Sequence, residues 1–496
     1  DVMQQLYEGI FTRIAKTHPL DYYWFWTPEN WTWEDVPEST VHTAIEDILT
    51  AVTAAGAAKA PFQLATCGWV LGPQFDRALF DARLPKNLPI SCISRAVGHD
   101  PVEPGFAKVS DRDKWAIPWL EDDPAMTSPQ LWAGRMRRDA YDARQYGCTG
   151  LMGIHWRTMI LGPNVSALAQ AAWEQDSWAS RKKETKDEKN AVIWPVDDFY
   201  GDWAAHQFGP AGGKAIAAIF EKIDGKLPRP SDWVDGPGGY RPDERPWSEV
   251  ANEYAFVDEL AALRPQVQGP GNLARFDYWL ANFQYLRATG EMRCHWAAYD
   301  KAMKQVKAES DAGRRSALAR EQALPLREKM VAAVTDAYTN LLATVNTSGA
   351  MGTVANLEQH TFPGMLDKPG EELAKQLGGE LPASAQLPAV YDGPARVIVP
   401  TVRGSLTQGE TLQLKVIVLA GKAPKTVEVC WRDMGTVEYQ TVPLENAARG
   451  VYKAAIAAKA DFEYYVRVVP ETGDALVWPP TAPETNQTVI FMPPVG

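Results

Sequence analysis

Short apolar runs alternate with amphipathic stretches of helical spacing over the first third of the chain. The runs cover residues 22–29, 62–70, 89–94, 114–123 and 150–157. Apolar runs of this length, bounded by charged or turn residues, are typical of strands buried on both faces. Five such strands separated by helices predict a parallel sheet with right-handed crossovers. The dipeptide Ser128-Pro129 predicts the start of a helix that ends at Gly147, before the fifth strand.

This alternation predicts the later strands of a TIM-type α/β barrel. A (β/α)8 barrel has eight strand–helix units, so three further units would have to precede Asp1. We therefore expect residues 1–196 to carry strands four to eight. An N-terminal segment that completes the barrel is then an expected partner. An open doubly wound sheet is the alternative, but no Gly-rich phosphate loop follows any of the five runs.

The rest of the chain changes its periodicity twice. Residues 197–388 have helical spacing and predict a helical domain, whose three long helices are expected at 271–289, 291–311 and 314–346. After Pro388 apolar residues alternate with polar ones, as they do between Leu412 and Val418. Several short runs of this kind predict a C-terminal all-β sandwich of the immunoglobulin or fibronectin type over residues 389–496.

Composition narrows the classes of function. The formal net charge of −12 argues against a nucleic-acid partner, because phosphate binding needs a basic face. No run reaches the roughly 18–20 apolar residues of a membrane span, so no membrane partner is expected. The five cysteines are widely spaced and form no ligand pattern, so we predict no metal site and no cofactor. Nucleophile-elbow, Walker and HExxH motifs are absent from the sequence.

A surplus of tryptophan favours a carbohydrate ligand. The chain contains 19 tryptophans, and the faces of indole rings stack on the apolar C–H faces of sugars. Core packing accounts for most of these residues, so composition alone shifts the expectation only modestly. The positions of acidic residues add to it.

Carboxylates stand at the ends of two aromatic strands. One strand leads to Glu29, and another, with two tryptophans, ends in Glu121, Asp122 and Asp123. The carboxyl ends of barrel strands meet at one rim, where glycoside hydrolysis would require an acid on one side of the bond and a second carboxylate across the ring. We therefore predict Glu29, in its apolar setting, as the acid/base and Glu121 as the nucleophile. Asp122 and Asp123 are rivals of Glu121, and Glu34 and Asp35 are rivals of Glu29.

Residues for sugar binding are expected at the ends of the same strands. The candidates are Trp26, Trp69, Asp76, Arg77, Arg95, His99, Asp123, His155, Trp156 and Arg157. His155 and Arg157 are the expected donors that keep Glu121 ionised. Structural roles are the alternative: Glu29 could cap a turn, and the acids at 121–123 could form a solvated turn or favour a helix N-terminus. Arg157 could equally be a buried structural arginine.

The chain resembles the later part of a multidomain bacterial glycoside hydrolase. Trp26-Thr27-Pro28-Glu29 and the acids at 121–123 resemble the strand-four and strand-seven arrangement of retaining barrel glycosidases. The stretch from Ile154 to Trp173 is similar in layout to the barrel end of alpha-glucuronidases, which also continue into a helical domain. In beta-N-acetylhexosaminidase-type barrels the acetamide of the substrate attacks with help from an acidic pair, and the acids at 121–123 leave that mechanism open.

These observations predict an exo-acting glycoside hydrolase that removes a terminal sugar from a plant or algal polysaccharide or oligosaccharide. Carbohydrate is then the expected substrate, and the expected location is extracellular or periplasmic. A non-catalytic carbohydrate-binding or scaffold protein is the rival from another class, because tryptophans and a sandwich domain would suffice for it. An N-acetylhexosaminidase-type hydrolase is the alternative within the same class.

Overall fold

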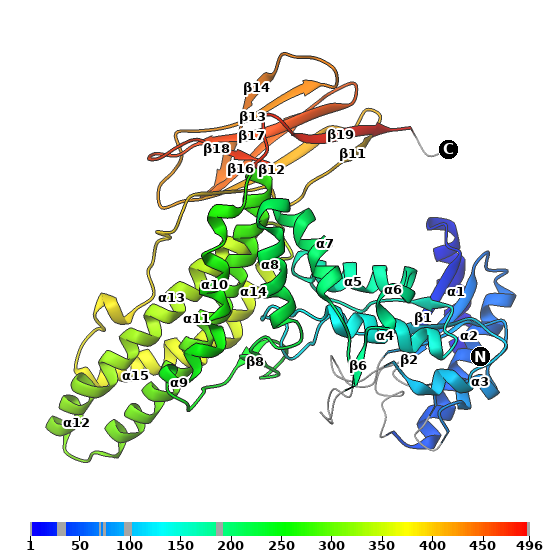
Figure 1. Cartoon of the computed structure of the whole chain (residues 1–496), viewed down its shortest axis with the longest axis horizontal. Coiled ribbons are helices and arrows are strands. Elements are labelled where there is room, and N and C mark those ends of the chain that lie inside the picture. Colours follow the sequence, from blue (N-terminus) through cyan, green and yellow to red (C-terminus); the bar gives the residue numbers. More distant parts are fainter. Residues whose placement is uncertain are drawn as a thin grey trace. The chain divides into compact units, whose positions relative to one another are not determined.

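The chain folds into two compact units that both combine helices with strands. The computed structural model describes residues 2–26, 36–68, 71–72, 76–93, 102–184 and 192–493 (Figure 1). The first unit contains residues up to 123 together with 130–199 and 221–227. The second contains residues 124–129, 200–220 and 228 onward.

A parallel sheet forms the centre of the first unit. Its strands are β1 (Tyr22–Trp26), β2 (Gln63–Gly68), β3 (Ile90–Ile93), β4 (Lys114–Ile117) and β5 (Gly150–Leu151). They lie in the sequential order β1-β2-β3-β4-β5, and every neighbouring pair is parallel. All five predicted strands are therefore confirmed, and so is their parallel pairing.

Helices cover one face of this sheet. They are α1 (Val2–Thr17), α2 (Glu38–Ala57), α3 (Leu79–Arg83) and α4 (Ala133–Gln145). Phe11, Ile45 and Phe80 from these helices join Leu64 and Ile90 from the strands in one buried cluster. The helical spacing of apolar residues thus serves to bury the helices against the strands.

The opposite face of the sheet carries aromatic side chains. The Tyr22 and Trp115 rings meet edge to face with centroids 5.4 Å apart. The Trp24 indole nitrogen donates to the Ser91 hydroxyl at 2.9 Å, two strands away. Gly150 lies beside Trp115, where a Cβ atom would come within 2.8 Å of the indole. A glycine is therefore required for this ring to lie across the edge strand.

Helix α4 begins later than the sequence predicts. Its first residue is Ala133 rather than one next to Ser128. The Asp224 carboxylate accepts hydrogen bonds from the Ala133 amide at 2.8 Å and the Gly134 amide at 3.0 Å. A side chain distant in the sequence thus supplies the cap that neighbouring residues usually supply, so local start signals were misleading. The unit also contains α5 (Gly162–Trp173), α6 (Asp176–Ala179) and the pair β6 (Lys183–Glu184) and β7 (Val192–Ile193).

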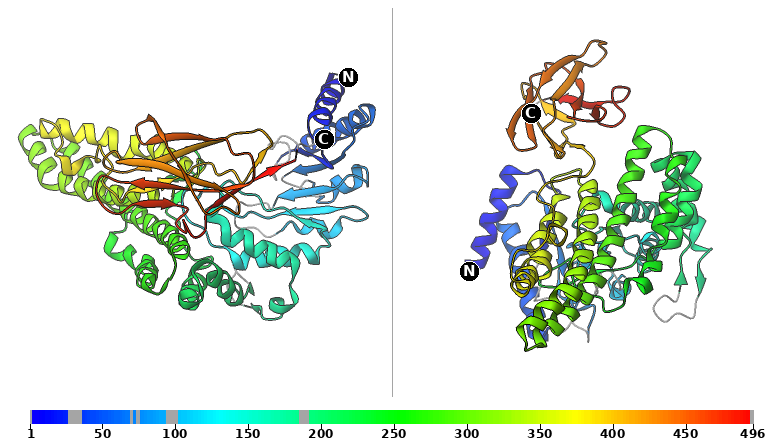
Figure 2. Two further views of the ribbon diagram at one scale, coloured as in Figure 1. Left: turned by 90° about the horizontal axis from the view of Figure 1, so that it is seen from above. Right: turned by 90° about the vertical axis from the view of Figure 1, so that its left-hand side faces the viewer.

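Helices make up the first part of the second unit. They include most of α7 (Asp197–Phe208) and of α8 (Pro210–Ile223), together with α9 (Trp247–Val250), α10 (Phe256–Ala261), α11 (Pro270–Ala308), α12 (Ala312–Leu318), α13 (Leu324–Thr344), α14 (Met351–Asn356) and α15 (Lys368–Leu377). The long helices α11 and α13 lie side by side (Figures 1 and 2). None of the helices in the described ranges has the length and apolar character needed to span a bilayer.

The prediction of two helices broken near Gly290 is wrong, because α11 is continuous across this residue. Gly290 accommodates the ring of Tyr254, whose hydroxyl would lie 2.3 Å from a Cβ atom at position 290. The glycine is thus a site of close packing and not a helix stop. The third predicted helix, at 314–346, is confirmed: residues 312–344 are helical throughout. A π-type segment (Ala319–Ala323) separates α12 from α13, in which Pro325 cannot donate a backbone hydrogen bond.

Substitution by alanine is expected to have opposite effects on stability at two glycines in helices of the second unit. Gly290→Ala is expected to lower the free energy of unfolding by about 1–3 kcal/mol, because the new methyl group overlaps Tyr254. Gly201→Ala in α7 meets nothing within 4 Å, so it is expected to raise stability by up to about 1 kcal/mol through helix propensity. Urea unfolding of both variants measures this. Equal effects would contradict the packing role of Gly290.

Two sheets form the C-terminal part of the second unit. One contains β10 (Arg396–Ile398), β12 (Leu412–Leu419), β16 (Val451–Ile456) and β15 (Glu445–Ala448). The other contains β11 (Ser405–Thr407), β19 (Gln487–Met492), β17 (Phe462–Val469), β13 (Thr426–Asp433), β14 (Gln440–Pro443) and β18 (Leu476–Trp478). Leu414 and Val416 from the first sheet share a buried cluster with Val429 and Tyr464 from the second. Alternate residues of the long strands β12 and β17 therefore face a common core, as the period of two predicts.

Candidate functional site

The loops after β4 and β5 lie together at the carboxyl end of the sheet. Beyond the two strands, Trp119 forms a parallel bridge with Ile154. The Leu120 amide donates to the Ile154 carbonyl at 2.9 Å, and the Ile154 amide donates to the Pro118 carbonyl at 3.0 Å. This extended pairing brings residues 121–123 beside residues 155–157, although the sequence separates them.

Glu121 is held by three hydrogen-bond donors from the neighbouring loop. One carboxylate oxygen accepts the Trp156 amide at 2.7 Å and the Arg157 amide at 2.8 Å. The other accepts Nε of the Arg157 guanidinium at 2.6 Å. Glu121 is 0% exposed, whereas the Arg157 side chain is 18% exposed. A buried carboxylate with an ion pair and two amide donors is strongly fixed in position.

Asp123 and Trp156 form the accessible part of the same site. The Trp156 indole nitrogen donates to the Asp123 carboxylate, while 56% of Trp156 is exposed. Asp123 itself is only partly buried. His155 is exposed, and its Nδ1 donates to the Arg157 carbonyl at 2.8 Å, which stabilises the turn. The site therefore presents an indole face and a carboxylate side by side.

Asp122 faces the interior, and buried amides fix its backbone. Only 1% of Asp122 is exposed. Its amide donates to the Gln130 side-chain oxygen at 2.6 Å, and the Gln130 side-chain nitrogen donates back to its carbonyl at 3.1 Å. Asn164, also fully buried, donates to the carbonyls of Leu120 and Gln130 at 2.8 and 3.1 Å. The side chains of Gln130 and Asn164 therefore fix the backbone of the loop that carries residues 121–123.

Helix α4 contributes a buried cluster of charges behind the loop. The Asp139 carboxylate is fully buried and lies 3.6 Å from both Arg135 and Arg138. Burial raises the pKa of Asp139. Burial also lowers the pKa of Arg135 to about 10, against the favourable charges of Asp139 and Asp122. Asp122 is thus electrostatically linked to this cluster, which supports a structural role for it.

Substitution of Asp142 in α4 by asparagine is expected to raise the stability of the protein in a pH-dependent way. Burial raises the pKa of Asp142 to about 6, with Asp139 adding to the rise and Arg138 and Lys182 opposing it. The folded state therefore holds the proton more tightly than the unfolded state, and wild-type stability falls as pH rises from about 4 to about 6. Asp142→Asn cannot ionise, so it is expected to be about 1–2 kcal/mol more stable than wild type at pH 7.5 and similar to it at pH 4.

Thermal unfolding at the two pH values checks this expectation. Asp176→Asn is the matched control, because the Asp176 side chain is 94% exposed. A gain from Asp142→Asn that is the same at both pH values would contradict the role of ionisation.

The remaining predicted site residues fall into two groups. Glu29, Trp69, Arg95 and His99 lie outside the described residues, so their roles stay predictions. The others have contacts in the structure. Asp76 accepts the Ala78 amide at 3.0 Å before α3, and buried Arg77 donates to the Gly72 carbonyl at 3.2 Å. Trp26 packs against Trp24 and belongs to the cluster around Ile117 and Trp119.

Sequence reasoning anticipated Arg157 as the partner of Glu121 but missed the supporting residues. Gln130 and Asn164 carry no charge and match no motif, so nothing local distinguishes them from other amides. What marks these two residues as supports of the site is the burial of their side chains, and burial is known only from the fold. Within the described part of the chain, no group of three or more His, Cys, Asp or Glu residues is arranged to hold a metal ion. The sequence matches no protein-family model and no curated protein.

Proposed function

We propose that this chain carries the site of a glycoside hydrolase that removes a terminal sugar from a plant or algal polysaccharide or oligosaccharide. The observation that carries the proposal is the pairing of an accessible carboxylate, Asp123, with the exposed indole of Trp156. An indole face beside a carboxylate is the combination that a sugar ring and its anomeric carbon require. The buried Glu121–Arg157 pair supports it by fixing both loops.

In this proposal the accessibility of each carboxylate determines its role in catalysis. Asp123 is the reacting carboxylate, because both oxygens of Glu121 accept hydrogen bonds inside the protein and Asp122 is buried. Glu29 remains the proposed general acid. It would donate its proton to the glycosidic oxygen as the bond from that oxygen to the anomeric carbon breaks. Asp123 would attack that carbon, deprotonate a water that attacks it or, in the substrate-assisted variant, orient the acetamide of the substrate.

The proposed fold of the first unit is the later part of a TIM-type barrel. The sequential strand order supports it, because the strand order reverses in a doubly wound sheet. Helical cover on one face supports it too, since barrel helices form an outer ring around strands whose other face points inward. For the two C-terminal sheets we propose an immunoglobulin-like sandwich, which their shared core supports. An extracellular or periplasmic location remains part of this proposal.

Hydrolysis of a panel of aryl glycosides tests the proposed function. Wild-type protein is expected to release the aryl group from at least one glycoside, and Glu29→Gln is expected to slow this by about 10²–10⁴-fold. Sugar binding by the same preparations is measured by calorimetry. Binding without cleavage of any glycoside would overturn the proposal in favour of a non-catalytic carbohydrate-binding protein.

A further inference from the structure

The segment that follows Asp123 belongs to the second unit. Residues 124–129, here called the strap, are part of that unit, and the chain returns to the first unit at Gln130. In the first unit, the paired hydrogen bonds between Asp122 and Gln130 join the two sides of the strap. Thr127, near the middle of the strap, is only 4% exposed. The strap is thus buried there, whereas most connecting segments run over the surface of a protein.

One glycine of the second unit holds the strap through both of its backbone groups. The Gly238 amide donates to the carbonyl of Pro124, the residue after Asp123, at 3.1 Å. The Gly238 carbonyl accepts the Thr127 hydroxyl at 2.9 Å. One residue therefore fixes the strap by two hydrogen bonds, and the first of them is made next to the accessible carboxylate.

Position 238 has room only for a glycine. Its φ of +75° lies in the left-handed region, which residues with a Cβ atom disfavour. A Cβ atom at this position would come within 2.5 Å of Cγ2 of Thr127. Gly236 in the same turn also has a positive φ, +127°, but a Cβ atom there would meet nothing within 4 Å. Close packing against the strap is therefore specific to Gly238.

A β-hairpin carries Gly238. Its strands β8 (Ser231–Asp232) and β9 (Gly239–Tyr240) pair in antiparallel fashion. The Ser231 hydroxyl lies 2.7 Å from the hydroxyl of Ser128 in the strap, and both residues are 1% exposed. A third buried hydrogen bond thus joins the hairpin to the strap.

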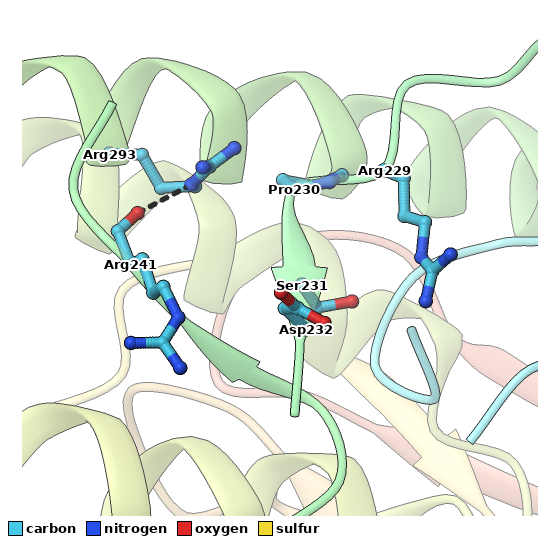
Figure 3. Close-up of a pocket in the computed structure, with 6 residues that line it drawn as sticks. All are labelled: Arg229, Pro230, Ser231, Asp232, Arg241 and Arg293. Atoms are coloured by element: carbon cyan, nitrogen blue, oxygen red, sulfur yellow. Dashed lines mark hydrogen bonds between the residues drawn. The ribbon is translucent and has the colours of Figure 1, made fainter. Parts of the chain in front are cut away.

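The hairpin is in turn fixed to the long helix α11. The hydroxyl of buried Tyr240 lies 3.0 Å from that of Thr127 and 2.7 Å from that of Tyr285 in α11. Directly after β9, the Arg241 carbonyl accepts Nε of Arg293 from α11 at 2.6 Å (Figure 3). The hairpin is therefore a rigid support, which is what a side chain held in a reactive geometry requires.

We propose that the β8–β9 hairpin positions Asp123, with Gly238 and Thr127 as the positioning residues. They act through the carbonyl of Pro124 and the backbone of the strap. The inference rests on the proposed hydrolase function and deepens it, because it assigns residues of the second unit to the control of the reacting carboxylate. A misplacement of about 1 Å can lower a catalytic rate by about 10²-fold, so an anchor one residue away is expected to matter.

Hydrogen–deuterium exchange of the full chain tests the anchoring without a substrate. The reporters are the amides of Asp122, Trp156 and Arg157, which donate to the side chains that fix the loop of residues 121–123. Gly238→Ala inserts a methyl group against the strap and is expected to speed the exchange of these amides at least fivefold.

Gly236→Ala is the matched control, because it makes the same substitution at positive φ in the same turn without a contact at Cβ. It is expected to leave the exchange of the reporter amides within about twofold of wild type. Thr127→Val removes the hydroxyl but keeps the branched shape of the side chain, and it is expected to speed the exchange at least threefold. Circular dichroism checks the folding of each variant.

Kinetics on the aryl glycoside that wild type cleaves fastest test the effect on catalysis. Gly238→Ala is expected to lower kcat at least tenfold and to leave KM within about threefold, because the sugar still binds while the carboxylate is displaced. Gly236→Ala is expected to leave kcat within about twofold. The double variant Gly238→Ala/Thr127→Ser lacks the methyl group that the new Cβ atom overlaps and keeps the hydroxyl, so it is expected to regain at least threefold in kcat.

The outcomes separate the anchoring from the hydrolase function. Equal kcat for Gly238→Ala and Gly236→Ala, or no regain in the double variant, would overturn the positioning role. Unchanged exchange of the reporter amides in both Gly238→Ala and Thr127→Val would overturn the anchoring itself. If wild type cleaves no glycoside while the exchange responds as expected, the hydrolase function fails and the anchoring stands.

Discussion

Asp123→Asn is expected to lower kcat/KM for glycoside hydrolysis by about 10²–10⁴-fold, the range typical of a lost catalytic acid or base. The substitution keeps the size of the side chain and an oxygen that can accept the Trp156 indole hydrogen. It removes the negative charge that would attack the anomeric carbon, activate water or orient an acetamide. Initial rates on the aryl glycoside cleaved fastest by wild type measure the effect.

Asp113→Asn is the control for this variant. Asp113 is exposed and directly precedes β4, at the opposite end of the strand from Asp123. The Asp113→Asn substitution makes the same change of charge as Asp123→Asn and is expected to leave kcat/KM within about twofold of wild type. If Asp123→Asn retained wild-type rates while Glu121→Gln abolished them, Glu121 would be the reacting carboxylate despite its burial.

Glu121→Ala is expected to lower the free energy of unfolding by about 3–5 kcal/mol, the cost of removing one partner of a buried ion pair. The truncation removes the carboxylate that pairs with the Arg157 guanidinium and accepts two backbone amides. Urea unfolding followed by tryptophan fluorescence measures the change.

A double-mutant cycle separates the ion pair from the other contacts of Glu121. Glu121→Gln keeps an acceptor for the amides, and Arg157→Gln removes the cation. The double variant is expected to be less destabilised than the sum of the two single variants, because each single variant loses the interaction between the two charges and the double variant loses it only once. Additive losses, or a loss below about 1 kcal/mol for Glu121→Ala, would contradict the role of this pair in fixing the loops.

Periodicity predicted the elements well and their ends poorly. The strands around Tyr22 and Lys114 were identified as short apolar runs, and the strands near Leu412 were identified because burial on one face imposes a period of two that the sequence displays. Helix ends depended on distant groups. Asp224 caps α4, and Tyr254 packs on Gly290 within α11. No local pattern records such contacts.

The candidate site was predicted in part for the same reason. Strand ends carry the acids and His155–Arg157, and parallel pairing brings them together, so Glu121 and Arg157 could be linked from the sequence alone. The accessibility of each acid could not be predicted from the sequence. It depends on the turn that buries Glu121 and leaves Asp123 beside the indole of Trp156.

The separation between the carboxyl carbons of Glu29 and Asp123 tests the central claim most directly. A crystal structure with a bound substrate analogue would measure it. We expect a separation of about 5–10 Å with the sugar between the two groups, where the shorter end indicates a covalent intermediate and the longer end an activated water. Carboxyl groups much farther apart than this, or pointing to opposite ends of the sheet, would contradict the account.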